Sequence, residues 1–259
     1  MNLSCAGASV RIGAKTLLAE ASVRLAPGHV TAILGPNGAG KSTLLSVLGG
    51  QRVPTEGRVL LDDRPLGSYK PAALALRRAL MPQESAVAFD FSAENIVALG
   101  RFPHRVAPGR DEDDIVAAAM ALTDVSALAP RVLNTLSGGE KSRVHMARAL
   151  AQLWHPRPDG AARWLLLDEP TAALDLAHQH AAMRLLRDWA AQGVGVVVVL
   201  HDLNLALRYA DEVVVVSAGS GVAQGPTTAL LQPPLIERVW ATPCQPVTAS
   251  DGTVQFLFG

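Results

Sequence analysis

The segment GPNGAGKST combines glycines, a lysine and two hydroxyl side chains at a spacing that suits a phosphate group. It matches the pattern G-x-x-x-x-G-K-[ST], in which backbone N–H groups turn around the phosphates, the lysine reaches the β- and γ-phosphates, and the hydroxyl binds Mg²⁺. We therefore expect a nucleoside triphosphate site. Its residues would be Gly35, Pro36, Asn37, Gly38, Ala39, Gly40, Lys41, Ser42 and Thr43.

Two adjacent carboxylates, Asp168 and Glu169, follow a short aliphatic run and precede Pro170. In open α/β sheets, ligands bind at the carboxyl ends of the strands. Here Asp168 would hold Mg²⁺, and Glu169 would orient and deprotonate the water that attacks the γ-phosphate. An acidic pair before a proline is common by itself, so the catalytic interpretation depends on the phosphate loop.

Two further side chains are candidates for the same site. His201 ends another aliphatic run, where it would donate to the γ-phosphate, and Asp202 after it is a good N-cap for a helix over residues 203–209. Gln83 follows the strand-like residues 77–81 and would bind Mg²⁺ through its carbonyl oxygen. A strand-end histidine can equally be inert, and a glutamine in a loop usually has no ligand.

The stretch NTLSGGEK, residues 134–141, opens a predicted helix but puts two glycines into its first turn. Ser137 and Glu140 have the spacing of a capping box. Gly138 and Gly139 cost helix stability, which indicates that something approaches the backbone closely. An anion at the helix N-terminus is one possibility and an ordinary capped helix is the other. The apolar positions behind them recur at helical spacing: Val144, Ala147, Ala151 and Trp154.

These residues need a sheet that brings them together. Aliphatic runs predict buried strands at residues 30–34, 77–81, 164–167 and 193–200. The phosphate loop lies between the first of these strands and a helical pattern, which is the context that a P-loop requires. The expected fold class is therefore an α/β P-loop NTPase.

Composition excludes several classes of protein. The 259 residues include 23 Lys and Arg against 23 Asp and Glu, so no basic excess favours nucleic acid as a partner. The longest apolar run, residues 194–200, is too short to span a bilayer. We expect no secretory signal and, with only Cys5 and Cys244, no disulfide framework, which fits a reducing cytoplasm.

Taken in order, these motifs resemble the ATP-binding cassette of ABC transporters over about residues 3–226. The resemblance implies ATP and Mg²⁺ as cofactors, and two ATP molecules held between two copies of the chain. The turn of Ser137, Gly138, Gly139 and Glu140 would then act on the partner's ATP, and Asp175 would be the aspartate of the D-loop. It also implies a mixed-sheet core with an N-terminal antiparallel β part and an inserted helical subdomain.

The same likeness suggests a division of the chain. We expect a nucleotide-binding core in residues 1–83 and 156–228, a helical signature subdomain in residues 84–155, and a tail in residues 229–259. A turn at Asp251 and Gly252 suggests a terminal hairpin. The helical subdomain would contact the membrane-embedded partner, and "GRFPHR" at residues 100–105 would be a solvated or partner-facing loop. An amphipathic helix is predicted behind the acidic residues 111–114, with Ile115, Val116, Ala119, Met120 and Leu122 on its apolar face.

The cargo is a narrower question. "FDFSAENIVALGRFPH" and "HDLNLALRYADEVVVV" look like cassettes of importers for vitamin B12, ferric siderophores and haem, and the surface loop "LWHPRPDGAARW" is similar in length to the haem branch. The expected function is therefore ATP hydrolysis that energises haem uptake through two permease subunits. A haem-binding periplasmic protein would act indirectly, and the chain would be peripheral at the cytoplasmic face of the inner membrane.

Two alternatives stay open. The cargo could be a ferric siderophore or vitamin B12. From another class, the chain could be a non-transport ABC ATPase that acts on nucleic acid or ribosomes, but those proteins have long coiled-coil insertions or two cassettes in one chain.

The sequence departs from the family pattern at the adenine site. The family usually has an aromatic residue near the start, around residues 11–13, but no Phe, Trp or Tyr precedes Tyr69. Adenine would then rest on Ile12 or Arg11, which weakens the case for strong selection of ATP over GTP. A GTPase is not indicated either, because the chain has no [NT]-K-x-D motif.

Overall fold

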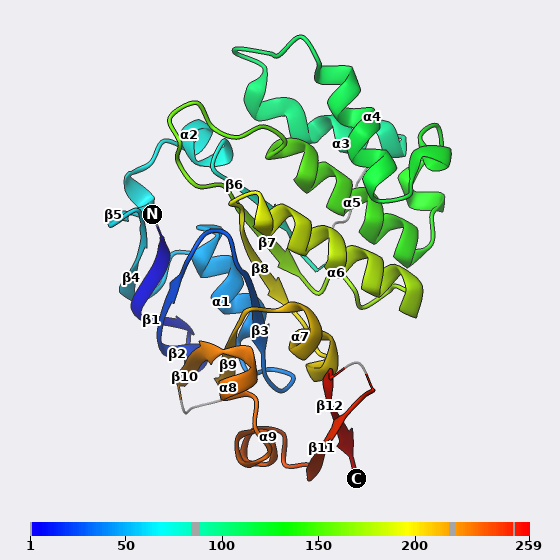
Figure 1. The fold of residues 1–259 in the computed structure, drawn as a ribbon. Coiled ribbons are helices and arrows are strands. Elements are labelled where there is room, and N and C mark those ends of the chain that lie inside the picture. The colour runs from blue at the N-terminus through cyan, green and yellow to red at the C-terminus, as the bar shows by residue number, and fades with distance from the viewer. Residues whose placement is uncertain (1, 84–88, 218–220, 251) are drawn as a thin grey trace.

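The computed structural model describes residues 2–83, 89–217, 221–250 and 252–259. Its centre is a six-stranded sheet in the order β10-β9-β3-β8-β7-β6, in which β10 is antiparallel to β9 and the other neighbours are parallel (Figure 1). The strands are β3 (Val30–Leu34), β6 (Arg78–Met81), β7 (Trp164–Asp168), β8 (Gly195–Val199), β9 (Glu212–Ser217) and β10 (Gly221–Pro226). Strands β3, β7 and β8 are buried throughout, as their aliphatic runs predict.

A second, antiparallel sheet is built from the N-terminal part of the chain. Its strands, in the order β2-β1-β4-β5, are β1 (Leu3–Ile12), β2 (Lys15–Leu25), β4 (Glu56–Leu61) and β5 (Arg64–Pro65). Helix α1 (Lys41–Leu48) contacts both sheets, and its apolar residues share one hydrophobic cluster with them. The predicted mixed-sheet core with an N-terminal antiparallel part is therefore confirmed.

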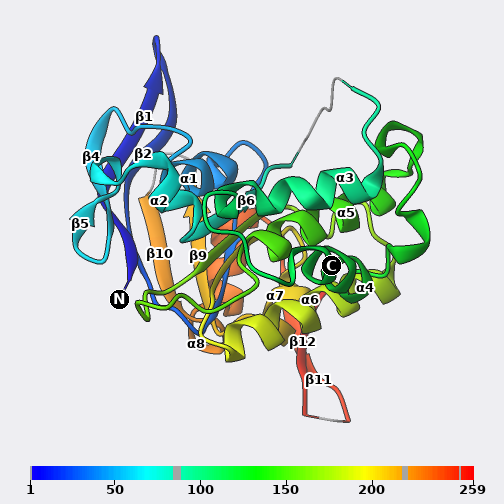
Figure 2. The ribbon, with the colours of Figure 1, turned by 90° about the horizontal axis from the view of Figure 1, so that it is seen from above.

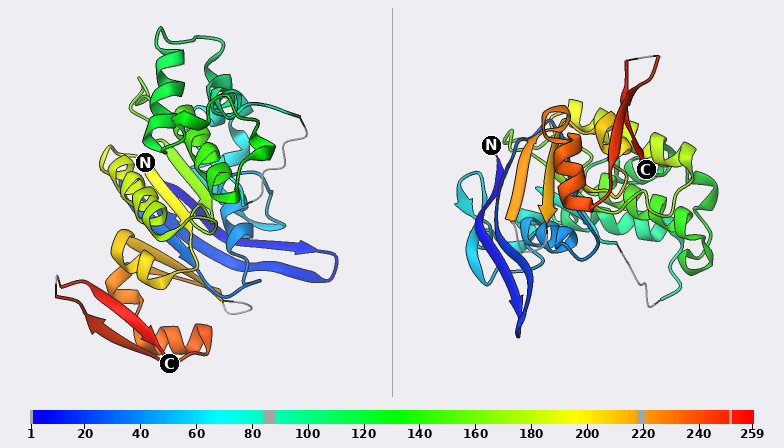
Figure 3. Two further views of the ribbon diagram at one scale, coloured as in Figure 1. Left: turned by 90° about the vertical axis from the view of Figure 1, so that its right-hand side faces the viewer. Right: turned by 90° about the horizontal axis from the view of Figure 1, so that it is seen from below.

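Helices cover the other face of the central sheet. They are α6 (Leu176–Ala191), α7 (Leu203–Tyr209) and part of α5 (Gly138–Gln152), which pack with the sheet around buried side chains such as Met183, Leu186 and Trp189. The predicted helix over residues 203–209 is confirmed, and the Asp202 carboxylate caps it by accepting from two backbone N–H groups. The β1–β2 hairpin and the C-terminal hairpin extend from this body in different directions (Figure 3).

A helical region lies at one end of the central sheet, and α5 belongs to both. It contains α3 (Ala93–Ala98), η2 (Leu99–His104), α4 (Glu112–Leu122), η3 (Ser126–Leu128) and η4 (Leu133–Thr135) beside α5 (Figure 2). These elements bury a cluster of their own that includes Ile96, Ile115 and Leu133. The predicted domain limits stay predictions, and the one after Gln83 opens onto residues 84–88, which lie outside the described residues.

An ion pair between Arg101 of η2 and Glu112 of α4 links two elements of the helical region. Arg101 binds both carboxylate oxygens of Glu112, at 2.7 and 3.0 Å, and also donates to the Ala151 carbonyl oxygen. The Arg101 hydrogen bonds lower the pKa of Glu112 to about 2. Residues 100–105, predicted as a solvated or partner-facing loop, lie in and directly after the 3₁₀ helix η2, which contributes the buried Arg101 side chain to this region. Contact with a partner stays a prediction.

One predicted core position is wrong, and another lies outside its helix. Leu122 is 48% exposed, because it is the last residue of α4 and the chain turns away at Asp124, whose φ is +54°. Trp154 lies two residues beyond the end of α5 but still packs against two hydrophobic clusters, and its ring meets Trp189 edge-on with the centroids 5.9 Å apart. The other predicted apolar positions of both helices are buried.

The remaining elements flank the core. They are η1 (Leu66–Ser68), α2 (Pro71–Ala75), α8 (Thr227–Leu230), α9 (Pro233–Trp240), β11 (Cys244–Thr248) and β12 (Val254–Phe258). Strands β11 and β12 pair antiparallel, so a terminal hairpin is present, although Asp251 of its predicted turn lies outside the described residues. The Asn204 side chain docks the hairpin by donating to and accepting from the Phe256 backbone.

The two cysteines are not joined by a disulfide bond. Cys5 is buried, Cys244 is half-buried, and both are free thiols. Burial raises the pKa of Cys5 to about 11, so it is an inert core residue. Among the described residues, no helix has the length and apolar character needed to cross a membrane.

Candidate active site

The phosphate loop joins the buried end of β3 to the start of α1. Two of its glycines are required by close approaches of the backbone. A Cβ atom on Gly35 would lie 2.1 Å from the Val216 carbonyl oxygen, and one on Gly40, whose φ is +105°, would lie 2.5 Å from that of Leu17. Only glycine fits at these positions, so the loop is pressed against β9 and β2.

Lys41 is almost fully buried beneath this loop. Its Nζ atom donates to the carbonyl oxygens of Gly35 at 2.9 Å and Pro36 at 3.0 Å. Burial lowers the pKa of Lys41, while the nearby carboxylates of Glu169 and Asp168 act in the opposite direction. The lysine ammonium is therefore held at the loop by the main chain.

Ser42 and Asp168 come from different elements and meet at the floor of the site. The Ser42 hydroxyl donates to Asp168 Oδ1 at 3.1 Å. Burial raises the pKa of Asp168, the Ser42 hydrogen bond lowers it, and the adjacent Glu169 raises it. The first turn of α1 thus lies against the end of β7, as the two sequence motifs predict.

Glu169 is held by residues that follow the two strands beside its own. His201 Nε2 lies 2.5 Å from its Oε1 atom, and Gln83 Nε2 donates to its Oε2 atom at 2.8 Å. A carboxylate only accepts hydrogen bonds, so His201 carries its proton on Nε2. Glu169 also has a φ of +50°, a conformation that non-glycine residues adopt at a cost and that is enriched at functional sites.

These residues surround a cleft of about 680 Å³, a volume within the usual range for ligand sites. The cleft is lined by Lys15, Thr16, Leu17, Asn37, Gly38, Gly40, Lys41, Ser42, Thr43, Gln83, Glu169 and His201. Most of the predicted nucleotide and catalytic residues are therefore brought together. Gly35, Pro36, Ala39 and Asp168 are not among the lining residues.

One wall of the cleft was not anticipated. It comes from the start of β2, at Lys15, Thr16 and Leu17, whereas neither Arg11 nor Ile12 is a lining residue. The Arg11 guanidinium lies 3.4 Å from the Glu56 carboxylate, and Ile12, which pairs with Lys15 across the hairpin, is 55% exposed. That adenine rests on one of these two residues stays a prediction. The sequence carries no local signal for this wall, because it depends on how the β1–β2 hairpin lies against the phosphate loop.

The LSGGE turn lies elsewhere in the chain. The capping box is confirmed: Ser137 Oγ accepts from the Glu140 backbone at 3.3 Å, and Glu140 Oε2 accepts from the Ser137 backbone at 2.7 Å. None of residues 137–140 lines the cleft. Gly139 has a neighbour within the chain, because a Cβ atom there would lie 2.8 Å from the Ala173 carbonyl oxygen. The close approach of Ala173 within the same chain therefore explains the glycine at position 139, in addition to the predicted role at a partner's ATP.

Asp175 ends the loop that begins at Glu169, and it does not line the cleft either. It is the N-cap of α6, where its Oδ1 atom accepts from the His178 backbone at 2.9 Å. Hydrogen bonds from the His178 backbone and ring lower the pKa of Asp175.

The oxygen atoms around Ser42 fit a magnesium ion. The Ser42 hydroxyl and the Asp168 carboxylate are already adjacent, and Gln83 uses its amide nitrogen toward Glu169, which leaves its carbonyl oxygen for another partner. Mg²⁺ prefers hard oxygen ligands and keeps several water or phosphate oxygens. In the described parts of the chain, no three His, Cys, Asp or Glu residues gather as a metal site.

Comparison with known proteins gives a consistent result. Residues 18–172 match the family model described as ABC transporter. The hemin import ATP-binding protein HmuV of Pseudomonas fluorescens is 48% identical over 231 residues, which cover 89% of this chain and 89% of that protein.

Two solved structures share the fold. One, an inward-facing ABC transporter assigned to the metal-chelate type, has a TM-score of 0.81 and 27% identity, over 100% of this chain and 97% of the other. The ATP-binding cassette MJ0796, solved as a dimer in a post-hydrolysis state with ADP and Pi, has a TM-score of 0.74 and 26% identity, over 87% and 98%.

Proposed function

This chain belongs to the ABC transporter family and is an ATPase of that family, and we propose that it is the subunit that energises a haem importer. The observation that carries the catalytic part is the position of Glu169 in the cleft, fixed by His201 and Gln83 beside the phosphate loop. The cargo rests on the high similarity to hemin import proteins along most of the chain.

The geometry supports a division of labour in hydrolysis. The loop N–H groups and Lys41 would hold the β- and γ-phosphates, and Glu169 would accept a proton from the attacking water. The water oxygen bonds to the γ-phosphorus as the bond to the β–γ bridging oxygen breaks, which gives ADP and phosphate. The His201 Nε2 proton, now directed at Glu169, would be shared with the γ-phosphate.

Magnesium would be held by Ser42, Asp168 and Gln83. When bound, Mg²⁺ would neutralise negative charge on the phosphates. The role of Ser42 and Asp168 is supported by their direct hydrogen bond, and that of Gln83 by its place on the cleft wall.

We further propose that two copies of the chain share each ATP. The turn of Ser137, Gly138, Gly139 and Glu140 lies outside the cleft of its own chain, which supports a role at a partner's cleft. The dimer of the related cassette MJ0796, which holds ADP and Pi, supports the same arrangement. Asp175 would act at this dimer interface as the D-loop aspartate.

The helical region is the proposed contact with two membrane permease subunits, within a unit at residues 84–155. Large apolar side chains are exposed along residues 89–106, with Val106 91%, Phe89 72% and Phe102 56% exposed. A contiguous patch of exposed apolar side chains is typical of a surface that a partner covers, and we expect these side chains to form part of one. The chain would then be peripheral at the cytoplasmic face of the inner membrane, and a haem-binding periplasmic protein would act through the permease.

An experiment on the whole importer tests this function. The chain is purified with its permease, placed in lipid nanodiscs, and its ATP hydrolysis is measured with haem-loaded or siderophore-loaded binding protein. We expect stimulation by the haem-loaded protein and none in the Glu169→Gln complex. Stimulation by a siderophore-loaded or vitamin B12-loaded protein instead would show that the cargo is a ferric siderophore or vitamin B12. No ATP hydrolysis under any condition would contradict the proposal that the chain is an ATPase.

A further inference from the structure

The loop at residues 169–175 links the catalytic carboxylate to helix α6, and its main chain is held from two sides. From α5, the Ser142 hydroxyl donates to the Pro170 carbonyl oxygen at 2.7 Å. From α6, the Gln179 side chain donates to the carbonyl oxygens of Thr171 at 3.3 Å and Leu174 at 3.0 Å. The conformation of this loop therefore depends on how α5 and α6 are placed.

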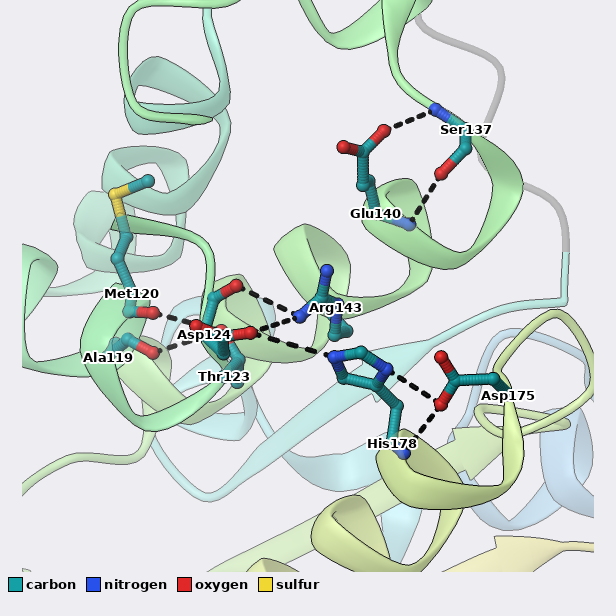
Figure 4. Close-up of polar contacts among 9 residues, drawn as sticks. All are labelled: Ala119, Met120, Thr123, Asp124, Ser137, Glu140, Arg143, Asp175 and His178. Carbon is teal, nitrogen blue, oxygen red and sulfur yellow. Dashed lines mark hydrogen bonds and ion pairs between the residues drawn. The ribbon is translucent and has the colours of Figure 1, made fainter. Parts of the chain in front are cut away.

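His178, in the first turn of α6, makes a further contact with the end of this loop (Figure 4). Its Nδ1 atom lies 2.8 Å from Asp175 Oδ1, the oxygen that also accepts from the His178 backbone. Since a carboxylate only accepts, Nδ1 carries a proton. The backbone hydrogen bond alone is enough to cap α6, so the ring adds a constraint on the direction of the Asp175 carboxylate.

The opposite edge of the His178 ring faces the helical region. Its Nε2 atom is 3.6 Å from Asp124 Oδ2. Asp124 occupies a tight turn after α4 with a φ of +54°, and Arg143 Nη1 donates to its carbonyl oxygen at 2.9 Å and to its Oδ2 atom at 2.8 Å. Arg143 belongs to α5, only one turn after Glu140 of the LSGGE turn (Figure 4).

These contacts form a continuous path from α5 through Asp124 and His178 to Asp175. Asp124 is largely exposed, so ion pairing here contributes little to stability. A role in geometry explains the arrangement better, because the ring is hydrogen-bonded to Asp175 on one side and faces Asp124, in another region of the fold, on the other. The contact with Asp124 at 3.6 Å is an ion pair when the ring carries a proton on both nitrogens.

We propose that His178 is a positioning residue, which holds Asp175 and the loop that begins at Glu169 in register with Asp124 and Arg143 of the helical region. The proposal rests on the ATPase function above. None of these residues except Glu169 lines the cleft. Loss of the ring should therefore slow the catalytic step and leave nucleotide binding intact.

The test compares three variants of the chain in complex with its permease. His178→Ala removes the ring, His178→Asn keeps a donor in the place of Nδ1, and His155→Ala is a matched control because His155 pairs with Asp111 at 2.8 Å on a surface loop. We expect His178→Ala to lower kcat about tenfold with the KM for ATP unchanged within about twofold. His178→Asn should restore part of kcat, and His155→Ala should match the wild type.

A double-mutant cycle with Asp124→Ala tests the path itself. If His178 acts through Asp124, the two losses of kcat will not multiply in the double variant. Losses that multiply, a wild-type kcat in His178→Ala, or a loss seen only as raised KM would each overturn the proposal.

Hydrogen exchange gives a readout that is independent of catalysis. Backbone amides of residues 171–174 should exchange faster in His178→Ala than in His155→Ala, and equal exchange would overturn the proposal. A wild-type complex without ATPase activity would contradict the proposed function instead, while the exchange measurement would still test the role of His178.

Discussion

Three features of Glu169 are consistent with a positioned general base. Both carboxylate oxygens are bound, by His201 and by Gln83, the backbone is in an uncommon conformation, and the side chain reaches the wall of a cleft that also contains the phosphate loop. The neighbouring Asp168 faces Ser42 instead. Two adjacent carboxylates therefore have different surroundings, which supports their separate roles.

Replacing Glu169 with Gln should leave ATP binding intact and lower kcat by about 10² to 10⁴, the usual contribution of a general base. Glutamine keeps the size of the side chain and can still bond Gln83 and His201, so the cleft should keep its shape. Isothermal titration with ATP and a phosphate-release assay measure the two quantities. A turnover equal to the wild type would remove Glu169 from its role.

His145 gives a pH-dependent prediction. It is 6% exposed in α5, neither ring nitrogen has a hydrogen-bond partner among the described residues, and burial, followed by Arg148 and Lys141, lowers its pKa to about 4. The unfolded chain, with a histidine pKa near 6.5, binds the proton first as the pH falls. The free energy of unfolding contributed by this residue should therefore be full above pH 6.5 and decrease between pH 6.5 and 4.

The His145→Leu variant checks this sign. Between pH 7 and pH 5 the wild type should lose about 1 to 2 kcal/mol more of its free energy of unfolding than the variant does. Urea unfolding at the two pH values measures the difference, and His155→Leu is a control because His155 is exposed. Parallel losses in wild type and His145→Leu would show that His145 is not the group responsible.

At the scale of elements, the strands and caps were readable from local chemistry. Residues 30–34 and 203–209 form the predicted strand and helix, because unbroken aliphatic runs and capping side chains specify them locally. The ends of helices were less readable. Leu122 and Trp154 both fit the helical spacing of apolar residues. However, Leu122 is the last residue of α4, before the turn at Asp124, and α5 ends at Gln152, two residues before Trp154.

The glycines of the LSGGE turn make a prediction about packing. A Cβ atom on Gly139 would meet the Ala173 carbonyl oxygen at 2.8 Å, whereas one on Gly138 would meet the Ala173 Cβ atom at 3.4 Å, an ordinary contact. Gly139→Ala should therefore lower the free energy of unfolding by about 1 kcal/mol or more, as overpacking does. Gly138→Ala should leave it unchanged or raise it slightly, because alanine favours the helix.

Thermal unfolding of the two variants side by side measures this difference. Equal stability of Gly139→Ala and Gly138→Ala would mean that the loop at Ala173 moves aside freely. In that case packing within the chain would not explain why position 139 is a glycine, and contact with a partner's ATP would remain as the explanation.

At the scale of the whole molecule, the sequence indicated which motifs belong together but not every surface that they form. The cleft wall at Lys15, Thr16 and Leu17 was missed because it depends on where the β1–β2 hairpin folds over the phosphate loop, a long-range contact with no local signature. The link from Asp124 through His178 to Asp175 was missed for the same reason. It joins the turn after α4 to the start of α6, two parts of the chain that are far apart in the sequence.

The central claim is that the LSGGE turn of one copy completes the ATP site of the other. Lys41→Ala disables a phosphate loop, and Ser137→Arg blocks a turn that lies outside its own cleft. Dimers with a different purification tag on each copy can carry the two changes on the same copy, beside a wild-type partner, or on opposite copies.

ATP hydrolysis by these two mixed dimers is the most direct measurement. If sites are shared, changes on opposite copies leave one site with both parts intact, and changes on the same copy damage both sites. We therefore predict that the dimer with changes on opposite copies retains the larger activity. The reverse order, with activity kept only when both changes lie on one copy, would mean that each chain uses its own turn and would contradict the account.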